Sequence, residues 1–414
     1  MLFKISELVV EKGLLRGPFG GALKKEIFVP KGEGTYKVYE QGCVLNHDHT
    51  IGNYYISKEY FEQKMKNFEV LPDDILVSCS GVNYGAIYKM PNDIEKGIIN
   101  QALLRIRLNN DIVDGDYFCF LFDNLISNII TSGSGDSTIP NFPPLSTIKE
   151  IKVDLPKLEE QKKIASFLMN YKKMISTNNL IVESLTNKIK EIYSYWFEQF
   201  KYPGFNDNNL TKQYYKILIP KQWEIKSFLE NDLWMNIKPG IHKFNGKKKY
   251  LSTSEVEQNT YVFGEDIDYF NRESRANMQP VGNSIWFAKM KKTIKHLAIT
   301  NESPLIQECI FSTGLLGLKC KENSFEYLWS IINSNWFEKS KDYIASGSTQ
   351  EAISEENINY LKIIIPPNEL LDLYHEKTKD YLSLICQLNY ENLILLNELS
   401  WFAKAFLSNN VILK

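Results

Sequence analysis

The feature that most constrains this chain is a long heptad pattern in its middle, between residues 164 and 196. Apolar residues recur there at alternating steps of four and three, and one central seam position is an asparagine. Seven residues make almost two helical turns, so such a seam keeps one helix face toward a partner helix. The seam residues are Ile164, Leu168, Tyr171, Ile175, Asn178, Val182, Leu185 and Ile189, followed by Ile192 and Trp196.

The same pattern returns 210 residues later, near the C-terminus. Its seam residues are Tyr374, Thr378, Tyr381, Ile385, Leu388, Asn392, Leu395, Leu399, Phe402 and Phe406. The segments before the helices also match, because IKEIKVDLP at 148–156 aligns with INYLKIIIP at 358–366. SGSG at 132–135 and SGST at 346–349 precede these two segments. A repeat at a fixed offset indicates a repeated architecture, although simple duplication followed by drift would leave the same pattern.

The sequence therefore predicts a mixed α/β fold made of two pseudo-repeated globular domains and two long helices. The first domain is expected at residues 1–156 and the central helix at 157–200. A linker rich in Pro, Gly and Asn and the second domain occupy 201–366, and the C-terminal helix occupies 367–414.

The two seam asparagines indicate how the helices pair. Parallel pairing would set Asn178 against Leu388 and Asn392 against Val182, whereas antiparallel pairing sets the two asparagines against each other. An unpaired buried amide costs about 1–3 kcal/mol. The sequence thus favours an antiparallel coiled coil, although each asparagine could instead face solvent.

Composition narrows the function. The six cysteines are scattered without a CxxC pair, as expected for reduced thiols and not for disulfides or a zinc site. No apolar run is long enough to span a membrane and the N-terminus lacks a signal-peptide pattern, so we expect a cytoplasmic protein with no membrane partner. The net charge is −2, whereas proteins that bind nucleic acid by charge alone are more basic.

Catalytic signatures are not found in the sequence. It has no GxxxxGK[ST] phosphate loop, no dinucleotide fingerprint and no Asn/Asp-Pro-Pro-aromatic loop of a DNA methyltransferase. HDH at 47–49 could be half of a metal site but has no companion ligands. We therefore predict a binding protein with no catalytic residues and no metal.

Basic residues interleaved with aromatics and amides are candidates for DNA contacts, since such side chains reach phosphates and base edges. In most proteins, however, a lysine run is only a solvated face. The candidates in the first domain are Lys24, Lys25, Lys37, Gln41, Asn83, Tyr84, Lys89, Arg105 and Arg107. In the second domain they are Lys243, Lys247, Lys248, Lys249, Arg272, Arg275, Lys289, Lys291, Lys292, Lys295 and His296.

The chain resembles the specificity subunits of type I restriction–modification systems. LPKLEEQKKIASFL at 155–168, IPKQWEIKSFL at 219–229 and NSIWFAKMKKTIKHLAIT at 283–300 carry the resemblance, together with 68–81 and 96–108. The second helix departs from it, because NELLDL at 368–373 replaces the LEEQ entry. The N-terminus also lacks the usual Pro-x-x-Trp opening.

The resemblance implies two target-recognition domains, each of which reads half of an asymmetric bipartite DNA site. It implies that the helix pair sets the spacer and docks two modification subunits of a DNA (adenine-N6) methyltransferase. S-adenosylmethionine would then be held by those partners, and ATP and Mg²⁺ by restriction subunits that translocate and cut DNA. The alternatives are a self-sufficient methyltransferase or nuclease, and a bivalent scaffold that binds two proteins without reading DNA.

Overall fold

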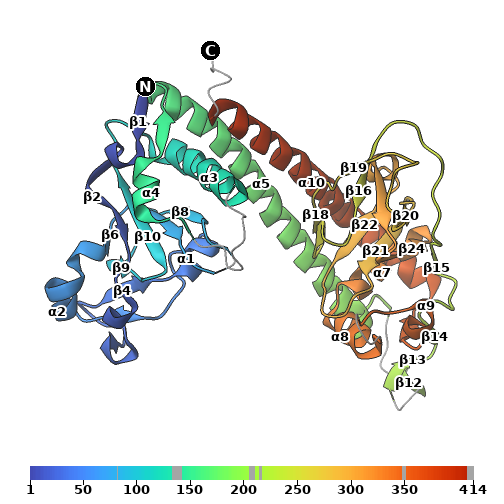
Figure 1. Cartoon of the computed structure of the whole chain (residues 1–414). Coiled ribbons are helices and arrows are strands. Elements are labelled where there is room, and N and C mark those ends of the chain that lie inside the picture. Colours follow the sequence, from blue (N-terminus) through green and yellow to red (C-terminus); the bar gives the residue numbers. More distant parts are fainter. Residues whose placement is uncertain (82, 133–141, 205–209, 214–216, 347–350, 408–414) are drawn as a thin grey trace. The chain divides into compact units, whose positions relative to one another are not determined.

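The computed structural model describes the chain except for residues 82, 133–141, 205–209, 214–216, 347–350 and 408–414. The chain forms two compact units, Met1–Lys173 with Asn397–Lys414, and Met174–Leu396. We call them unit 1 and unit 2. Each includes part of both long helices, α5 (Leu158–Tyr193) and α10 (Asn368–Leu407) (Figure 1). The predicted mixed α/β fold is confirmed, and the boundaries expected at 156, 200 and 366 stay a prediction.

Unit 1 contains two main sheets. A four-stranded antiparallel sheet has the order β2 (Val9–Arg16), β10 (Leu103–Leu108), β7 (Ile75–Ser78) and β8 (Ile87–Lys89). A five-stranded sheet has the order β3 (Phe28–Val29), β5 (Tyr55–Ile56), β4 (Tyr36–Tyr39), β9 (Gly97–Ile99) and β6 (Glu69–Val70). β1 (Leu2–Lys4) pairs with β11 (Lys152–Asp154), and the helices are α1 (Gln41–Leu45), α2 (Lys58–Tyr60), α3 (Gly115–Ser132) and α4 (Leu145–Glu150).

Unit 2 repeats this plan. Its antiparallel sheet has the order β15 (Trp234–Asn236), β24 (Leu315–Cys320), β21 (Ser284–Ala288) and β22 (His296–Ile299). Its second sheet has the order β19 (Asp266–Ile267), β16 (Lys248–Leu251), β23 (Cys309–Ser312) and β20 (Ala276–Met278). β14 (Glu224–Ser227) pairs with β25 (Lys362–Ile365).

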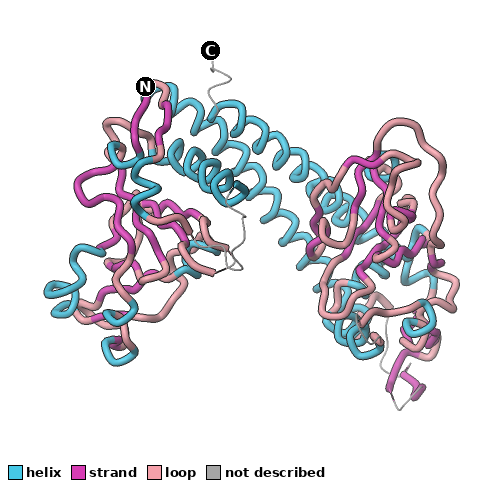
Figure 2. The backbone as a smooth tube through the Cα atoms, in the orientation of Figure 1, coloured by secondary structure: helices cyan, strands magenta, loops and turns pink. Residues whose placement is uncertain are grey.

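The remaining elements of unit 2 are short. Its hairpins are β12 (Leu210–Gln213) with β13 (Ile217–Pro220) and β17 (Val256–Glu257) with β18 (Thr260–Tyr261). Its helices before α10 are α6 (Leu305–Glu308), α7 (Phe325–Ile332), α8 (Asn335–Ile344) and α9 (Glu355–Ile358). Figure 2 shows how helices and strands are distributed in each unit. Among the described helices, none combines the length and apolar character needed to cross a membrane.

The topology of the two units shows the internal repeat. In each unit one pair of central strands is parallel, β4 with β9 and β16 with β23, and the flanking strands of both sheets are antiparallel. The offset of 210 residues relates the starts of β11 and β25, of α4 and α9, and of α5 and α10. The sequence match therefore reflects one supersecondary plan used twice.

Equivalent positions in the two four-stranded sheets carry different side chains. In unit 1 Leu76 of β7 lies opposite Arg105 of β10, whereas in unit 2 Trp286 of β21 lies opposite Gly317 of β24. A Cβ on Gly317 would approach the Trp286 ring to 2.5 Å, so only glycine leaves room for this indole. The same pair of strands thus accommodates side chains of very different size in the two units.

The first turn of α5 is fastened to unit 1 by Gln161, which is buried. Its side-chain oxygen accepts a hydrogen bond from the Asp114 backbone NH at 3.0 Å, and its amide donates to the carbonyl oxygens of Ile112 and Pro156. The position of α10 that corresponds to Gln161 is Leu371, which is fully buried in the apolar core of unit 2. The absence of the LEEQ entry in the second helix therefore reflects an apolar contact in place of a polar one.

Within unit 2, α5 and α10 pair in an antiparallel manner through their asparagines. The Asn178 side-chain amide donates to the Asn392 side-chain oxygen at 3.0 Å, and the Asn392 amide donates to the Asn179 side-chain oxygen at 2.9 Å. Further along, the rings of Trp196 and Tyr374 lie 5.9 Å apart between centroids. The residue numbers of these pairs rise on one helix as they fall on the other, as antiparallel helices require. The participation of Asn179 is not evident from the seam.

Within unit 1, the same register continues between the start of α5 and the end of α10. The ring of Phe167 packs against Phe402 and Phe406, with centroids 4.9 and 5.7 Å apart. Ile164 and Leu168 join the same core as Phe406. Aromatic rings on both helices thus close the apolar core at this end of the pair.

The helix surfaces are broader than a strict two-in-seven seam. None of the predicted seam residues is exposed, but α10 also buries Leu370, Leu382 and Leu393, outside the seam. These side chains belong to a helix that packs on its own domain as well as on α5, since Leu370 and Leu382 lie in the main core of unit 2. α10 is therefore a core helix of a globular domain with a coiled-coil face, which the heptad pattern alone does not predict.

We predict that Asn178→Leu destabilises unit 2 by about 1–3 kcal/mol, because the Asn392 oxygen loses its donor in a buried position. The double variant Asn178→Leu/Asn392→Leu should recover much of this loss, since the two leucines pack against each other. Asn179, which loses the Asn392 amide, is exposed and can bind water instead. Denaturant unfolding of both single variants and the double variant measures the coupling. Asn187→Leu, at an exposed position of the same helix, is the control. Strictly additive effects would contradict the proposed coupling.

Candidate nucleic-acid interface

The candidate DNA contacts separate by burial into three groups. Lys37, Arg105 and His296 are buried, with 1, 3 and 2% of their surface exposed. Half-buried candidates are Gln41, Tyr84, Lys89, Arg107, Lys248, Lys249, Arg272, Lys289, Lys291 and Lys295. Fully exposed candidates are Lys24, Lys25, Asn83, Lys243, Lys247, Arg275 and Lys292. A side chain must reach the surface to touch a phosphate or a base edge, so the exposed group carries the stronger candidates.

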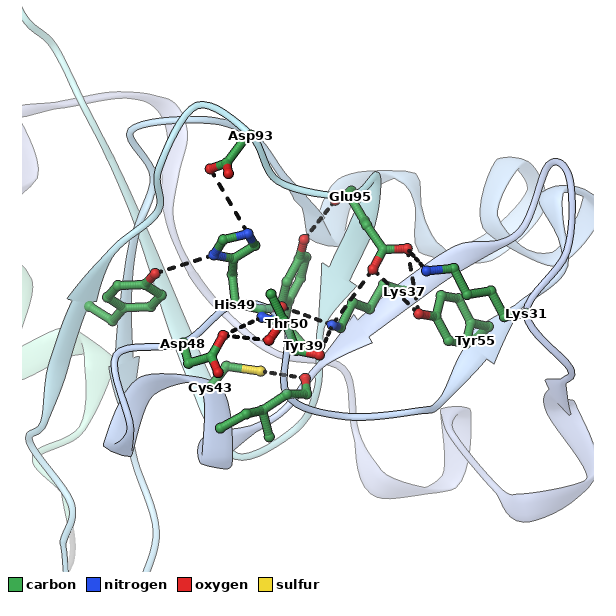
Figure 3. Close-up of polar contacts among 12 residues, drawn as sticks. Lys31, Lys37, Tyr39, Cys43, Asp48, His49, Thr50, Tyr55, Asp93 and Glu95 are labelled. Atoms are coloured by element: carbon green, nitrogen blue, oxygen red, sulfur yellow. Dashed lines mark hydrogen bonds and ion pairs between the residues drawn. The ribbon is translucent and has the colours of Figure 1, made fainter. Parts of the chain in front are cut away.

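The buried Lys37 side chain binds the loop of unit 1 that contains His49 and Thr50 (Figure 3). Its ammonium donates to the backbone oxygens of His49 and Thr50, at 2.8 Å each, and lies 3.8 Å from the Glu95 carboxylate. Glu95 also pairs with Lys31 at 2.8 Å, and this hydrogen bond is the main cause that lowers the pKa of the Glu95 carboxyl. Lys37 therefore satisfies two partly buried backbone carbonyl groups and, being buried itself, is not positioned to contact DNA directly.

Asp48 and His49 of the HDH segment have partners within unit 1, in their own loop and in the segment at 88–93 (Figure 3). The Asp48 carboxylate accepts hydrogen bonds from the Thr50 backbone NH at 2.8 Å and hydroxyl at 2.6 Å. His49 lies 3.5 Å from the Tyr88 hydroxyl and 3.9 Å from Asp93. In the part of the chain that the structure describes, no group of three or more His, Cys, Asp or Glu side chains is placed to hold a metal ion.

Arg105 and Arg107, at alternate positions of β10, both bind partners within unit 1. Arg105 donates to the backbone oxygens of Asn67, Glu69 and Lys12, at 3.0, 2.6 and 3.0 Å. Arg107 forms a bidentate pair with the buried Asp74, both contacts being 2.7 Å. This hydrogen-bonded pair raises the pKa of the Arg107 guanidinium. Both arginines thus tie β10 to the segments beside it.

His296 joins a buried polar cluster of unit 2. Its Nε2 lies 2.7 Å from one Glu338 oxygen, and the other Glu338 oxygen lies 2.7 Å from Lys341, which is fully buried. Lys341 in turn donates to the Thr293 carbonyl oxygen. The cluster fastens α8 to the loop that precedes β22, so His296 supports this basic loop from inside.

Most half-buried candidates also have partners in their own unit. Lys89 pairs with Asp116 at 2.7 Å, Lys249 with Asp266 at 2.7 Å and Lys291 with Glu351 at 2.9 Å. The Gln41 amide donates to the Ser78 hydroxyl at 2.8 Å, and the Lys295 ammonium donates to the Thr253 carbonyl at 2.7 Å. For Lys289, burial lowers the pKa of the ammonium.

Exposed aromatic residues near the exposed lysines are not among the candidates that the basic clusters of the sequence predicted. Phe19 of unit 1 is 94% exposed and precedes Lys24 and Lys25 in the same loop. Phe270 of unit 2 is 77% exposed, and the Lys243 ammonium lies 5.3 Å from the centroid of its ring. GPFGG and DYFNR, in which an aromatic is flanked by turn residues, are the signals that could have indicated them.

The repeated fold and the exposed basic loops define a two-domain protein whose helices join two copies of one α/β plan. Residues 19–187 match the family model described as Type I restriction modification DNA specificity domain. The predicted resemblance to type I specificity subunits is thereby confirmed, and two relatives that align with 73% and 80% of this chain agree with it.

Two specificity subunits of Methanocaldococcus jannaschii are similar to this chain. The type I restriction enzyme MjaIX specificity subunit is 25% identical over 327 residues, which is 73% of this chain and 68% of the relative. The MjaVIII specificity subunit is 24% identical over 365 residues, or 80% and 79% of the two chains. The crystal structure of a type I restriction–modification system S subunit from M. genitalium has the same fold, with 13% identity, a TM-score of 0.52 and coverage of 98% and 96%.

We predict that Lys37→Met lowers the free energy of unfolding of unit 1 by about 1–3 kcal/mol, because two partly buried backbone carbonyl oxygens lose their donor. Lys25→Met, at an exposed position, should change it by no more than about 0.5 kcal/mol. Denaturant unfolding of both variants tests this expectation. Equal stability of the two variants would show that the Lys37 contacts contribute nothing to the fold.

Proposed function

We propose that this chain is the non-catalytic DNA-recognition subunit of a type I restriction–modification complex. Each globular domain would read one half of an asymmetric bipartite site in double-stranded DNA. The helix pair would set the distance between the halves and dock two methyltransferase subunits. S-adenosylmethionine would be bound by those modification subunits, and ATP and Mg²⁺ by restriction subunits.

The duplicated plan with diverged loops is the observation that carries this proposal. Both units share sheet order and strand direction, whereas the loops that bear the exposed basic residues differ in sequence and length. Two readers of different half-sites need this combination, because a common scaffold presents unlike side chains to unlike bases. The near-neutral net charge supports a subunit whose affinity for DNA depends on partners.

A bivalent protein scaffold is the competing function, because two copies of one domain plan could hold two protein partners. The experiment that separates the two is footprinting of the chain together with its modification subunits on DNA from the source genome, guided by the positions of methylated bases. Two short protected patches with an unprotected gap support DNA reading. Protection that follows no sequence, with an intact protein complex, would favour the scaffold.

We predict that exchanging residues 205–366 for the matching segment of another specificity subunit changes one half of the methylated sequence and leaves the other half unchanged. The reason is that each unit has its own core and its own loops. Methylome sequencing of cells that carry the exchanged chain is the measurement. Alteration of both halves would show that the domains do not read independently.

We also predict that four extra residues in each long helix, placed on matching sides of Asn178 and Asn392, lengthen the unread spacer by one or two base pairs. Four residues add about 6 Å of helix, and duplex DNA rises about 34 Å per 10 base pairs. The half-sites themselves should stay the same. Methylome sequencing again gives the answer, and an unchanged spacer in an active complex would contradict a ruler role for the helices.

A further inference from the structure

Two loops of unit 2 bring aromatic rings and cations together. The loop between β15 and β16 contributes Lys243 and Phe244, and the loop between β19 and β20 contributes Tyr269, Phe270 and Arg272. We call these five residues the aromatic tip. The Tyr269 ring meets Phe244 edge to face at 5.8 Å and Phe270 edge to face at 5.4 Å between centroids. Edge-to-face packing of this kind fixes ring orientation.

Cations cover part of the tip. The Lys243 ammonium lies 5.3 Å from the centroid of the Phe270 ring, and the Arg272 guanidinium lies 4.5 Å from that of Tyr269. Such contacts hold positive charge at the face of an aromatic ring. The tip therefore combines an apolar ring with cations directly beside it.

The turn that carries Phe270 is stabilised by hydrogen bonds. One Asp268 oxygen accepts hydrogen bonds from the backbone NH groups of Phe270 and Asn271, at 3.0 Å each, and the other accepts from the Asn271 amide at 3.0 Å. Arg272 donates to the carbonyl oxygens of Tyr269 and Ala276. The exposed ring is thus held outward by its turn at little further entropic cost on binding.

The charges around the ring favour an anionic partner. Lys243 and Lys247 are exposed, and neither forms an ion pair within the described part of the chain. The nearby Asp266 is paired with Lys249 at 2.7 Å, and Asp268 is engaged in the turn itself. Glu265 and Glu273, which flank this turn in the sequence, are also exposed, and the positive charge nearest to the Phe270 ring is the Lys243 ammonium, 5.3 Å from the ring centroid. An ammonium beside an exposed ring is suited to a phosphate next to a base.

We infer that Phe270 inserts as a wedge between neighbouring base pairs of the half-site read by unit 2, while Lys243 and Lys247 contact the flanking phosphates. This rests on the proposed function and assigns to it a particular residue and a local distortion of the duplex. Apolar wedges flanked by basic side chains unstack base steps and kink DNA, and every base offers a face for stacking on an aromatic ring. A single exposed ring is large enough to stack between two base pairs, but it offers little contact area to a protein partner.

The test uses the chain in complex with its modification subunits and duplexes that carry the methylated site. 2-Aminopurine is placed at each position of the second half-site in turn, since its fluorescence rises when it is unstacked. The wild-type complex should raise the fluorescence at one step other than the methylated base. Phe270→Ala should remove this rise and weaken binding about tenfold, whereas Phe270→Leu should keep part of both effects, because leucine is also a wedge.

Two control variants make the test specific. Tyr360→Ala removes an exposed aromatic ring of unit 2 that lies outside the tip, and it should change neither affinity nor fluorescence. Lys243→Gln should lower the slope of log affinity against log salt concentration by about 1 and keep the fluorescence rise, because it removes one phosphate contact. Phe270→Ala should leave the salt slope unchanged.

Several outcomes would overturn the wedge. Normal affinity and fluorescence in Phe270→Ala, with the bipartite site still protected, would reject the wedge and leave half-site reading intact. Loss of a subunit from the complex, with normal DNA contacts, would assign the tip to a protein partner instead. A wild-type complex that protects no bipartite site would reject the proposed function and the wedge together.

Discussion

The hydrogen bond between Asn178 and Asn392 fixes the arrangement on which unit 2 is built. A seam of leucines and isoleucines alone would tolerate several registers, because one apolar side chain packs nearly as well as the next. A buried amide accepts few of these registers, since it must face another polar group. The side chain of Asn179 extends the pairing into a short polar ladder, with the Asn392 amide satisfied on its second side. Direction and register of the helices thus depend on a few polar atoms inside an apolar interface.

The two helix starts reach the same structural result by different chemistry. Gln161 satisfies one backbone NH and two carbonyl groups in unit 1, whereas its counterpart Leu371 fills an apolar core in unit 2. A similar exchange occurs in the sheets, where Trp286 over Gly317 replaces the pairing of Leu76 with Arg105. Backbone topology is therefore retained while the interactions that stabilise it change from polar to apolar. This freedom explains why the repeat shows few identities although the strand order is the same.

The elements that could be predicted from the sequence are those specified by local periodicity. The heptads of α5 and α10, and the strands before them at an offset of 210, depend on residues close in the chain. The candidate contacts were harder to predict, because burial of a cation depends on groups that the fold brings to it. Arg105 is bound by carbonyl groups of Lys12 and Glu69, and Lys341 by Glu338 and Thr293. No property of a lysine or arginine in the sequence alone distinguishes these structural cations from exposed ones.

Only part of the positive charge of the chain is available to attract DNA, because some of the cations are buried inside the two units. Lys37, Arg105 and Lys341 neutralise carbonyl dipoles or carboxylates inside the units and so contribute little attraction for a phosphate at the surface. The exposed candidate cations lie in a few loops, and two of these loops follow equivalent edge strands, β2 before Phe19 and β15 before Lys243. With little long-range attraction, the proposed discrimination between DNA sequences would come from short-range contacts at these loops. Under the proposed function, a shared scaffold with a near-neutral charge would therefore confine sequence reading to the segments in which the two copies differ most.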